Sequence, residues 1–189
     1  MAILKIARMG HPVLMGKAQL VTDPTAAGVH QLVADMIETM LDAPGIGLAA
    51  PQVHVPARIV IFRVPGERDE TDDGVALTVL INPEIEPLSD EMADGIEGCL
   101  SLPEMAGTVS RHTHIRYRAV DLNGEAFEVE AEGYHARVVQ HECDHLDGIL
   151  YPMRMTDLGK LGYAEEMSKA AEPPYSDGPD TAENDNDND

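Results

Sequence analysis

The sequence predicts an α+β fold in which antiparallel or mixed β-sheets pack around a central helix at residues 134–146. Two segments show helical periodicity, several short segments show continuous or alternating apolar residues, and the two kinds do not follow each other in a βαβ rhythm. With 189 residues, the chain is long enough for one domain that buries its own core without disulfide bonds.

The first helix is expected over residues 24–43, where apolar side chains recur at helical spacing. Thr22 or Asp23 is the expected N-cap, and Pro44 with Gly45 ends the helix. The next segment, residues 45–52, is nearly uncharged and rich in small residues. We therefore expect a surface loop whose backbone other groups can approach closely.

Strands are expected at residues 57–64, 75–82, 112–121 and 125–132, with a charged loop at 67–74. Asn82-Pro83 is expected to end the second strand, and the Asn123-Gly124 pair predicts a hairpin turn between the last two. The second main helix, residues 134–146, should end at Asp147-Gly148. A shorter helix is expected around residues 156–170.

The net charge is −21, and the acidic residues are concentrated at the C-terminus. Residues 171–189 hold seven acids and no Lys or Arg, which leaves 27 acids against 13 bases in the body. We expect a catalytic domain over residues 1–170 and a disordered acidic tail over 171–189. This charge argues against nucleic-acid or anionic-membrane partners.

Targeting and redox features are sparse. No apolar run is long enough to span a bilayer, and the first residues lack the pattern of a secretory signal, so a soluble, cytoplasmic protein is expected. The two cysteines, Cys99 and Cys143, cannot form a disulfide framework.

The strongest chemical signal is an HExxH pattern, residues 141–145, within the second helix. His141 and His145 lie one turn apart on the same face, so both imidazoles can reach one metal ion. Glu142 lies beside that face, where it can contact water without binding the metal. The alternative is a pair of helix-surface histidines beside a chance glutamate.

A metal site of this kind needs a third ligand, and residue spacing leaves the choice open. Asp147 sits close to the helix stop. Cys143 lies about 200° around the helix from His141, so it should face away and pack. Cys99 lies in a segment kinked by Gly98 and Pro103, but a lone cysteine is more often a packing residue.

Three segments together resemble the signature motifs of peptide deformylases. They are Gly45-Ile46-Gly47-Leu48-Ala49-Ala50-Pro51-Gln52, Glu97-Gly98-Cys99-Leu100-Ser101-Leu102-Pro103 and Gln140-His141-Glu142-Cys143-Asp144-His145-Leu146. Their order and separations are those of the family. The resemblance extends over about residues 4–160, including Gly10-His11-Pro12-Val13-Leu14, Ile81-Asn82-Pro83 and Tyr151-Pro152.

The resemblance implies removal of the formyl group from the N-terminal formyl-methionine of new polypeptides, with release of formate. It implies Cys99, His141 and His145 as metal ligands, with a water in the fourth position and Glu142 as general base and then acid. The Gln52 amide and the Leu100 backbone N–H would hold the formyl oxygen as it becomes an oxyanion.

The resemblance also implies a substrate site, a metal and partners. Ile46, Gly47 and Gly98 would contact the substrate, and the peptide would add as a strand near Ile46 and Gly47. Tyr134 and Val138 would line the methionine pocket, although ordinary helix packing explains both equally well. One divalent metal is expected, Fe(II) natively, with Zn, Ni or Co as substitutes. The expected partner is the formyl-methionyl nascent peptide. The protein is expected to be a monomer in a bacterial cytoplasm, with transient proximity to the ribosome.

The chain departs from the family at three places. Pro44 stands where many members carry an acid, Ala106 stands where many bacterial members carry Arg, and Arg137 resembles a subset that includes organellar members. These departures bear on affinity and side-chain preference rather than on the chemistry. The acidic tail would be repelled by ribosomal RNA, so it is not expected to anchor the protein there.

Other functions remain open at this level. An HExxH zinc peptidase would need no Cys99. A catalytically inactive homologue would act as a binding protein, but such copies usually lose one of the site residues, and all are present here. A structural zinc site would need four protein ligands, of which three are convincing.

Overall fold

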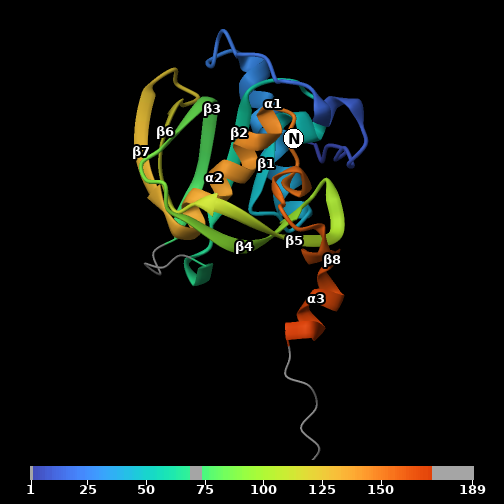
Figure 1. Ribbon diagram of the computed structural model, residues 1–189. Coiled ribbons are helices and arrows are strands. Elements are labelled where there is room, and N and C mark those ends of the chain that lie inside the picture. The colour runs from blue at the N-terminus through green and yellow to red at the C-terminus, as the bar shows by residue number, and fades with distance from the viewer. Residues whose placement is uncertain (1, 69–73, 172–189) are drawn as a thin grey trace, which may run out of the picture.

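Two antiparallel sheets and three α-helices form the described part of the chain, which in this computed structural model is residues 2–68 and 74–171 (Figure 1). The strands are β1 (Gly47–Ala49), β2 (Ile59–Val64), β3 (Val75–Pro87), β4 (Met92–Cys99), β5 (Leu102–His112), β6 (His114–Val120), β7 (Ala126–Glu132) and β8 (Leu161–Tyr163). The helices are α1 (Ala27–Asp42), α2 (Gly133–Leu146) and α3 (Ala164–Ala171).

The strands form a five-stranded sheet in the order β1-β2-β3-β6-β7 and a three-stranded sheet in the order β4-β5-β8. All neighbouring strands in both sheets are antiparallel. The predicted α+β class with antiparallel sheets is therefore confirmed. Helix α2 passes between the two sheets (Figure 1), and β1 and β4 are edge strands.

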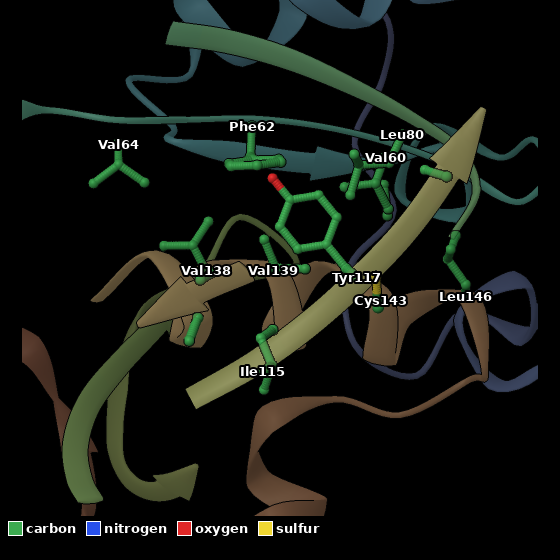
Figure 2. Packing of buried hydrophobic residues seen from close by; sticks show 14 of the residues in the cluster. Val60, Phe62, Val64, Leu80, Ile115, Tyr117, Val138, Val139, Cys143 and Leu146 are labelled. Carbon is green, nitrogen blue, oxygen red and sulfur yellow. The ribbon is translucent and has the colours of Figure 1, made fainter. Parts of the chain in front are cut away.

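Helix α2 packs its apolar side against the five-stranded sheet (Figure 2). Most of the larger buried side chains of this cluster come from α2 and from strands β2, β3 and β6, and they include Val138, Val139, Cys143, Leu146, Val60, Phe62, Leu80, Ile115 and Tyr117. Burying each aliphatic or aromatic side chain of this size contributes about 1.5–3 kcal/mol. Cys143 packs here, on the side of the helix away from His141, as its position around the helix predicts.

Helix α1 covers a second cluster through Val33, Met36 and Met40, which are spaced at helical intervals and fully buried. The predicted start at residue 24 is wrong by three residues. The Asp23 carboxylate accepts the backbone N–H of Thr25, so it closes a short turn instead of capping the helix. Ala26 occupies the N-cap without a side-chain bond.

Strand β3 does not end at Asn82-Pro83 as predicted, because the chain forms a bulge there and continues to Pro87. Asn82 adopts φ of 52°, in the left-handed region that asparagine tolerates. Its side chain accepts the N–H of Val21 and donates to the Val21 carbonyl, both across 2.9 Å. These bonds tie the N-terminal segment to the sheet.

Two other predictions, the surface loop at residues 45–52 and the helix at residues 156–170, are wrong in part. Residues 45–52 are mostly buried rather than a surface loop, because residues 47–49 form edge strand β1 and Ala50–Val53 a short 3-10 helix. The helix predicted at 156–170 is confined to α3, because Asp157 caps a 3-10 turn at Leu158–Lys160 and Leu161–Tyr163 pairs with β5.

Other predicted segments agree or lie outside the described residues. The turn between β6 and β7 is present, with Gly124 at φ of 81°. The charged loop is described only in part, since residues 69–73 lie outside the described range, and so does the acidic tail from residue 172 onward. None of the described helices is both long and apolar enough to traverse a bilayer.

Candidate metal and active site

A cavity of about 680 Å³ opens between the two sheets, beside α2. It is bordered by the segment before β1, by the β4–β5 hairpin and by one side of α2. Residues singled out in the sequence line this cavity, among them Pro44, Ile46, Gly47, Gln52, Gly98, Cys99, Leu100, Ala106, Tyr134, Arg137, Val138, His141 and Glu142. The three motifs, which are far apart in the chain, therefore meet at one place.

Cys99, His141 and His145 bring one ligand atom each to within 4.8 Å of one another. Cys99 comes from the end of β4, and the two histidines come from α2. The Cys99 Sγ lies 3.3 Å from His145 Nε2, and the two imidazole centroids are 5.1 Å apart. Both histidines are buried, and Cys99 is half-buried.

The chemistry of this donor set fits a divalent transition metal. One sulfur and two imidazole nitrogens suit Zn, Fe, Co or Ni better than the oxygen-seeking Mg or Ca. His141 Nδ1 lies 2.8 Å from a Glu97 carboxylate oxygen, so it carries the proton and leaves the Nε2 lone pair for a metal. Burial lowers the pKa of His145 well below its ordinary value, which favours the neutral form that binds metals.

Glu142 is buried beside the ligands and is not one of them. Its Oε2 has no hydrogen-bond partner among the described residues. Burial raises the pKa of Glu142 to about 7, where a carboxylate can both accept and return a proton near neutral pH. A buried carboxylate oxygen without a hydrogen-bond partner, on a residue that lines the same cavity as Cys99 and His141, is suited to a proton-transfer role.

Gly47 makes room for this carboxylate. A Cβ at position 47 would lie 2.1 Å from Glu142 Oε1, which is closer than any real contact. The close backbone approach expected for this glycine-containing segment therefore comes from Glu142 on α2.

Gln52 also lines the cavity and is fully buried, in the 3-10 helix that follows β1. Its Oε1 accepts the Ala49 N–H across 2.8 Å, and this bond directs Nε2 toward the β4–β5 turn. Nε2 donates to Ser101 Oγ at 3.1 Å and lies 3.5 Å from Cys99 Sγ. The amide donor is thus next to the candidate metal ligands.

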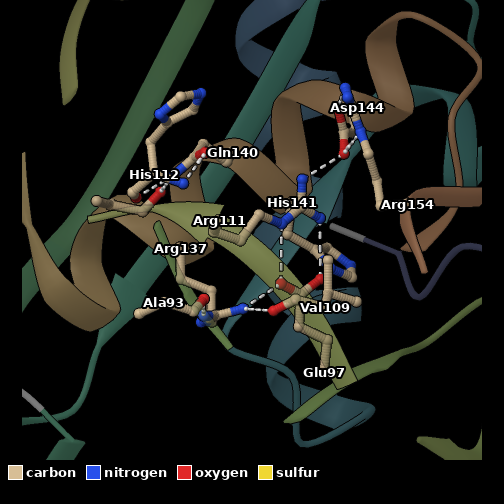
Figure 3. A network of polar contacts seen from close by, with 11 residues as sticks. Ala93, Glu97, Val109, Arg111, His112, Arg137, Gln140, His141, Asp144 and Arg154 are labelled. Atoms are coloured by element: carbon tan, nitrogen blue, oxygen red, sulfur yellow. Dashed lines mark hydrogen bonds and ion pairs between the residues drawn. The ribbon is translucent and has the colours of Figure 1, made fainter. Parts of the chain in front are cut away.

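A buried ionic network behind the histidines was not predicted from the sequence (Figure 3). The Glu97 carboxylate accepts bonds from Arg111, Arg137 and His141. Burial alone would raise the pKa of Glu97, but the bonds from Arg111 and His141 outweigh it and lower the pKa to about 2. Arg111 also reaches Asp144 on α2 across 2.5 Å.

Little in the sequence distinguishes these residues from solvated surface charges. The proximity of Glu97 to Cys99, within the second signature segment, was the available signal. Asp144 lies inside the HExxH pattern, where attention falls on the histidines and the glutamate. Arg154 closes the chain of ion pairs at the surface, with Nη2 at 2.6 Å from Asp144 Oδ1.

Comparisons with known proteins place this site in context. Residues 3–161 match the sequence model of the family described as polypeptide deformylase. Peptide deformylase 1 of Bordetella pertussis is 50% identical over 169 residues, which cover 89% of this chain and 96% of that protein.

Solved structures of peptide deformylases resemble this chain in fold and sequence. The Met-Ala-Ser-bound class I type b peptide deformylase of Acinetobacter baumannii has a TM-score of 0.75 and 37% identity, covering 82% of this chain and 99% of that one. The peptide deformylase of Ehrlichia chaffeensis has a TM-score of 0.77 and 32% identity, covering 84% and 91%.

Proposed function

The chain belongs to the polypeptide deformylase family, and from that premise we propose that Cys99, His141 and His145 hold its divalent metal. Proteins of this family are metal-dependent hydrolases that remove the formyl group from nascent peptides, and that is the function of this chain. The observation that carries the metal assignment is the convergence of three ligand atoms within 4.8 Å, beside the buried Glu142.

Glu142 is proposed as the general base and then the general acid. When bound, the metal makes a water more acidic and polarises the carbonyl oxygen of the substrate. Glu142 removes a proton from the attacking water, and the water oxygen bonds to the formyl carbon. Glu142 then delivers the proton to the methionine nitrogen as the C–N bond breaks, which yields formate and a free amine.

Gln52 and Leu100 are proposed to stabilise the charge that develops on the formyl oxygen. The Gln52 Nε2 already lies beside the Cys99 sulfur, and Leu100 follows Cys99 directly in the turn between β4 and β5. A thiolate ligand donates charge and weakens the metal as a Lewis acid. Hydrogen-bond donors at the oxygen are therefore expected to contribute strongly to the rate.

The substrate backbone is proposed to lie between two strand edges. β1 is the edge strand of the larger sheet and β4 that of the smaller sheet, and both border the cavity. Gly47 and Gly98 supply backbone without side chains at these edges, with Ile46 next to them. An extended peptide can add to such edges through main-chain hydrogen bonds.

The methionine side chain is proposed to enter the part of the cavity lined by Tyr134 and Val138, one turn apart on α2. Pro44 and Ala106 also line the cavity, where many relatives carry charged side chains. We therefore expect weaker polar contact with the substrate backbone than in those relatives. Fe(II) is proposed as the native metal, with Zn, Ni or Co as substitutes.

Residues 1–170 are proposed as the catalytic domain of a cytoplasmic monomer, since nascent peptides emerge in the cytoplasm. The acidic segment 171–189 is proposed not to anchor the protein to the ribosome. Ribosome pelleting should be the same for the full chain and for a chain ending at residue 170. Loss of association on truncation would refute this.

The test of the main proposal is formate release from formyl-Met-Ala-Ser by protein purified without oxygen and loaded with Fe(II) or Ni(II). We expect turnover that stops with a chelator and no cleavage of acetyl-Met-Ala-Ser or of an internal peptide bond. Internal cleavage would instead support the zinc-peptidase alternative. Bound metal without turnover would support an inactive binding protein. The family match favours neither alternative.

A further inference from the structure

The Glu97 carboxylate is fully occupied by donors. Arg111 donates from Nε and Nη2 to its two oxygens, each across 2.9 Å. Arg137 adds a bond from Nη1 to Oε1 at 2.9 Å, and His141 adds one from Nδ1 to Oε2 at 2.8 Å. A carboxylate offers about four acceptor positions, so all of them are in use. The orientation of Glu97, and with it that of the His141 ring, is set by the two arginines.

Arg137 does more than contact Glu97 (Figure 3). It lies on α2 one turn before His141 and is nine-tenths buried. Its Nη1 also donates to the Val109 carbonyl on β5 across 2.8 Å, and its Nη2 donates to the Ala93 carbonyl on β4 across 2.6 Å. One side chain therefore joins α2 to both long strands of the smaller sheet.

This link connects the two elements that supply the candidate ligands. Cys99 belongs to β4, whereas His141 and His145 belong to α2. On the other side of His141, Asp144 of α2 is bound to Arg111 of β5. The ion pairs Arg137–Glu97 and Arg111–Asp144 lie on either side of His141 along α2. The first holds α2 to β4, and the second holds it to β5.

Gly95 on β4 is shaped to receive Arg137. A Cβ at position 95 would lie 2.7 Å from the Arg137 Cζ and 2.8 Å from its Nε and Nη2. The backbone of Gly95 is not in the left-handed region that favours glycine, so its conformation does not require glycine. The missing side chain is needed for the guanidinium, and the two residues form a matched pair.

We propose that Arg137, seated on Gly95, is a positioning residue that clamps β4 and Glu97 to α2 and thereby holds the metal ligands at binding distance. The inference rests on the proposed metal site and extends it to a residue that contacts neither the metal nor the substrate's reacting atoms. Outer-shell partners of metal-binding histidines typically change metal affinity or activity by about 10–100-fold when removed.

The test measures metal affinity by competition with a chelator, together with kcat, KM and the unfolding midpoint of the loaded enzyme. Arg137→Met should bind metal about 10–100-fold more weakly. Arg137→Lys, which keeps the charge but not the planar fork, should be intermediate. Gly95→Ala should weaken metal binding as Arg137→Met does. The double variant should be no weaker than the more affected single variant, because both changes break one contact.

Two controls separate positioning from general destabilisation. Val33→Ala should lower stability in the α1 cluster, which contains no residue of the ionic network, and should keep wild-type metal affinity in the folded state. Arg118→Met removes an exposed arginine of β6 that pairs with Glu128 of β7 in the five-stranded sheet. It should change neither the metal affinity nor the unfolding midpoint. Arg137→Lys and Gly95→Ala keep the test decisive if Arg137→Met fails to fold.

Wild-type affinity in Arg137→Met and Gly95→Ala, with a lowered unfolding midpoint, would overturn the inference and leave Arg137 as a structural residue only. Additive losses in the double variant would overturn the pairing with Gly95. If Cys99→Ser binds metal as the wild type does, the proposed metal site itself is wrong and the inference falls with it. Failure of the metal site is distinguishable from failure of the Arg137 inference, because Cys99→Ser is tested in a chain that keeps Arg137.

Discussion

The side-chain amide of Gln52 donates to the hydroxyl of Ser101 across 3.1 Å. The bond from Ala49 to its Oε1 leaves only one way to orient the amide, with the nitrogen toward the cavity. Ser101 comes from the β4–β5 turn, and Gln52 follows β1, so this contact joins the edges of the two sheets. It holds a hydrogen-bond donor next to the candidate ligand Cys99 before any substrate arrives.

Replacing Gln52 by Leu should lower kcat by about 100- to 1000-fold, because an oriented donor to the developing oxyanion is lost. Metal content should not change, and metal analysis of the purified variant checks this. Ser101→Ala should have a smaller effect, about tenfold or less, since it removes one hydrogen bond that orients the amide. Loss of metal in Gln52→Leu would contradict the assigned role.

Glu142→Gln should retain stoichiometric metal and lose about 100- to 10,000-fold in kcat, the usual contribution of a general base or acid. The amide keeps the size of the side chain but cannot accept the proton. Formate release and metal content should be measured on the same preparation. If the variant has lost its metal, Glu142 is a ligand and the mechanism above is wrong.

Gly47→Ala should reduce turnover at least about tenfold, because the new Cβ would lie 2.1 Å from Glu142 Oε1 and displace the carboxylate. Gly28→Ala is the matched control. It lies in the first turn of α1 with nothing within 4 Å of a new Cβ, so it should leave kcat unchanged and stabilise the helix by at most about 0.5–1 kcal/mol, the value for a helix interior. Equal kcat in Gly47→Ala and wild type would argue against the position assigned to Glu142.

Chelation of the metal should abolish formate release, and readdition of Ni(II) should restore it. The loaded protein should also unfold at a higher temperature, since a ligand at 100 times its Kd stabilises the native state by about 2.7 kcal/mol. Cys99→Ser should lose both effects. Cys143→Ser should keep them, because burial raises the pKa of Cys143 and the residue packs in the core. Metal loss in Cys143→Ser alone would reverse the assignment of the two cysteines.

Asn82→Ala should destabilise the protein by about 2–4 kcal/mol in urea unfolding. It removes two hydrogen bonds to Val21 and places alanine at φ of 52°. The ratio kcat/KM of the folded enzyme should be unchanged, because the bulge lies away from the cavity lining. Asn123→Ala, in the exposed turn after β6, removes one side-chain bond to Asp121, should cost about 1 kcal/mol or less and serves as the comparison.

Several features followed from local pattern. The periodicity of residues 134–146 predicted α2 nearly to the residue, and the spacing of His141 and His145 put both imidazoles on one face. By contrast, the β4–β5 hairpin was not predicted as two long strands. Its sequence contains Gly95, Gly98 and Gly107 among polar residues and lacks the β-branched runs that mark a strand.

The sequence by itself determined the fold class, the motif-bearing helix and the family, because helical and strand periodicities are local and the signature segments are contiguous. Only the tertiary structure decided which other groups meet that helix. Residue spacing alone could not select among Cys99, Cys143 and Asp147, and Glu97, Arg111 and Arg137 look like ordinary surface charges until the smaller sheet closes over them. Such charges remain buried only because each finds partners from distant segments, and pairing at long range leaves no periodic trace in the chain.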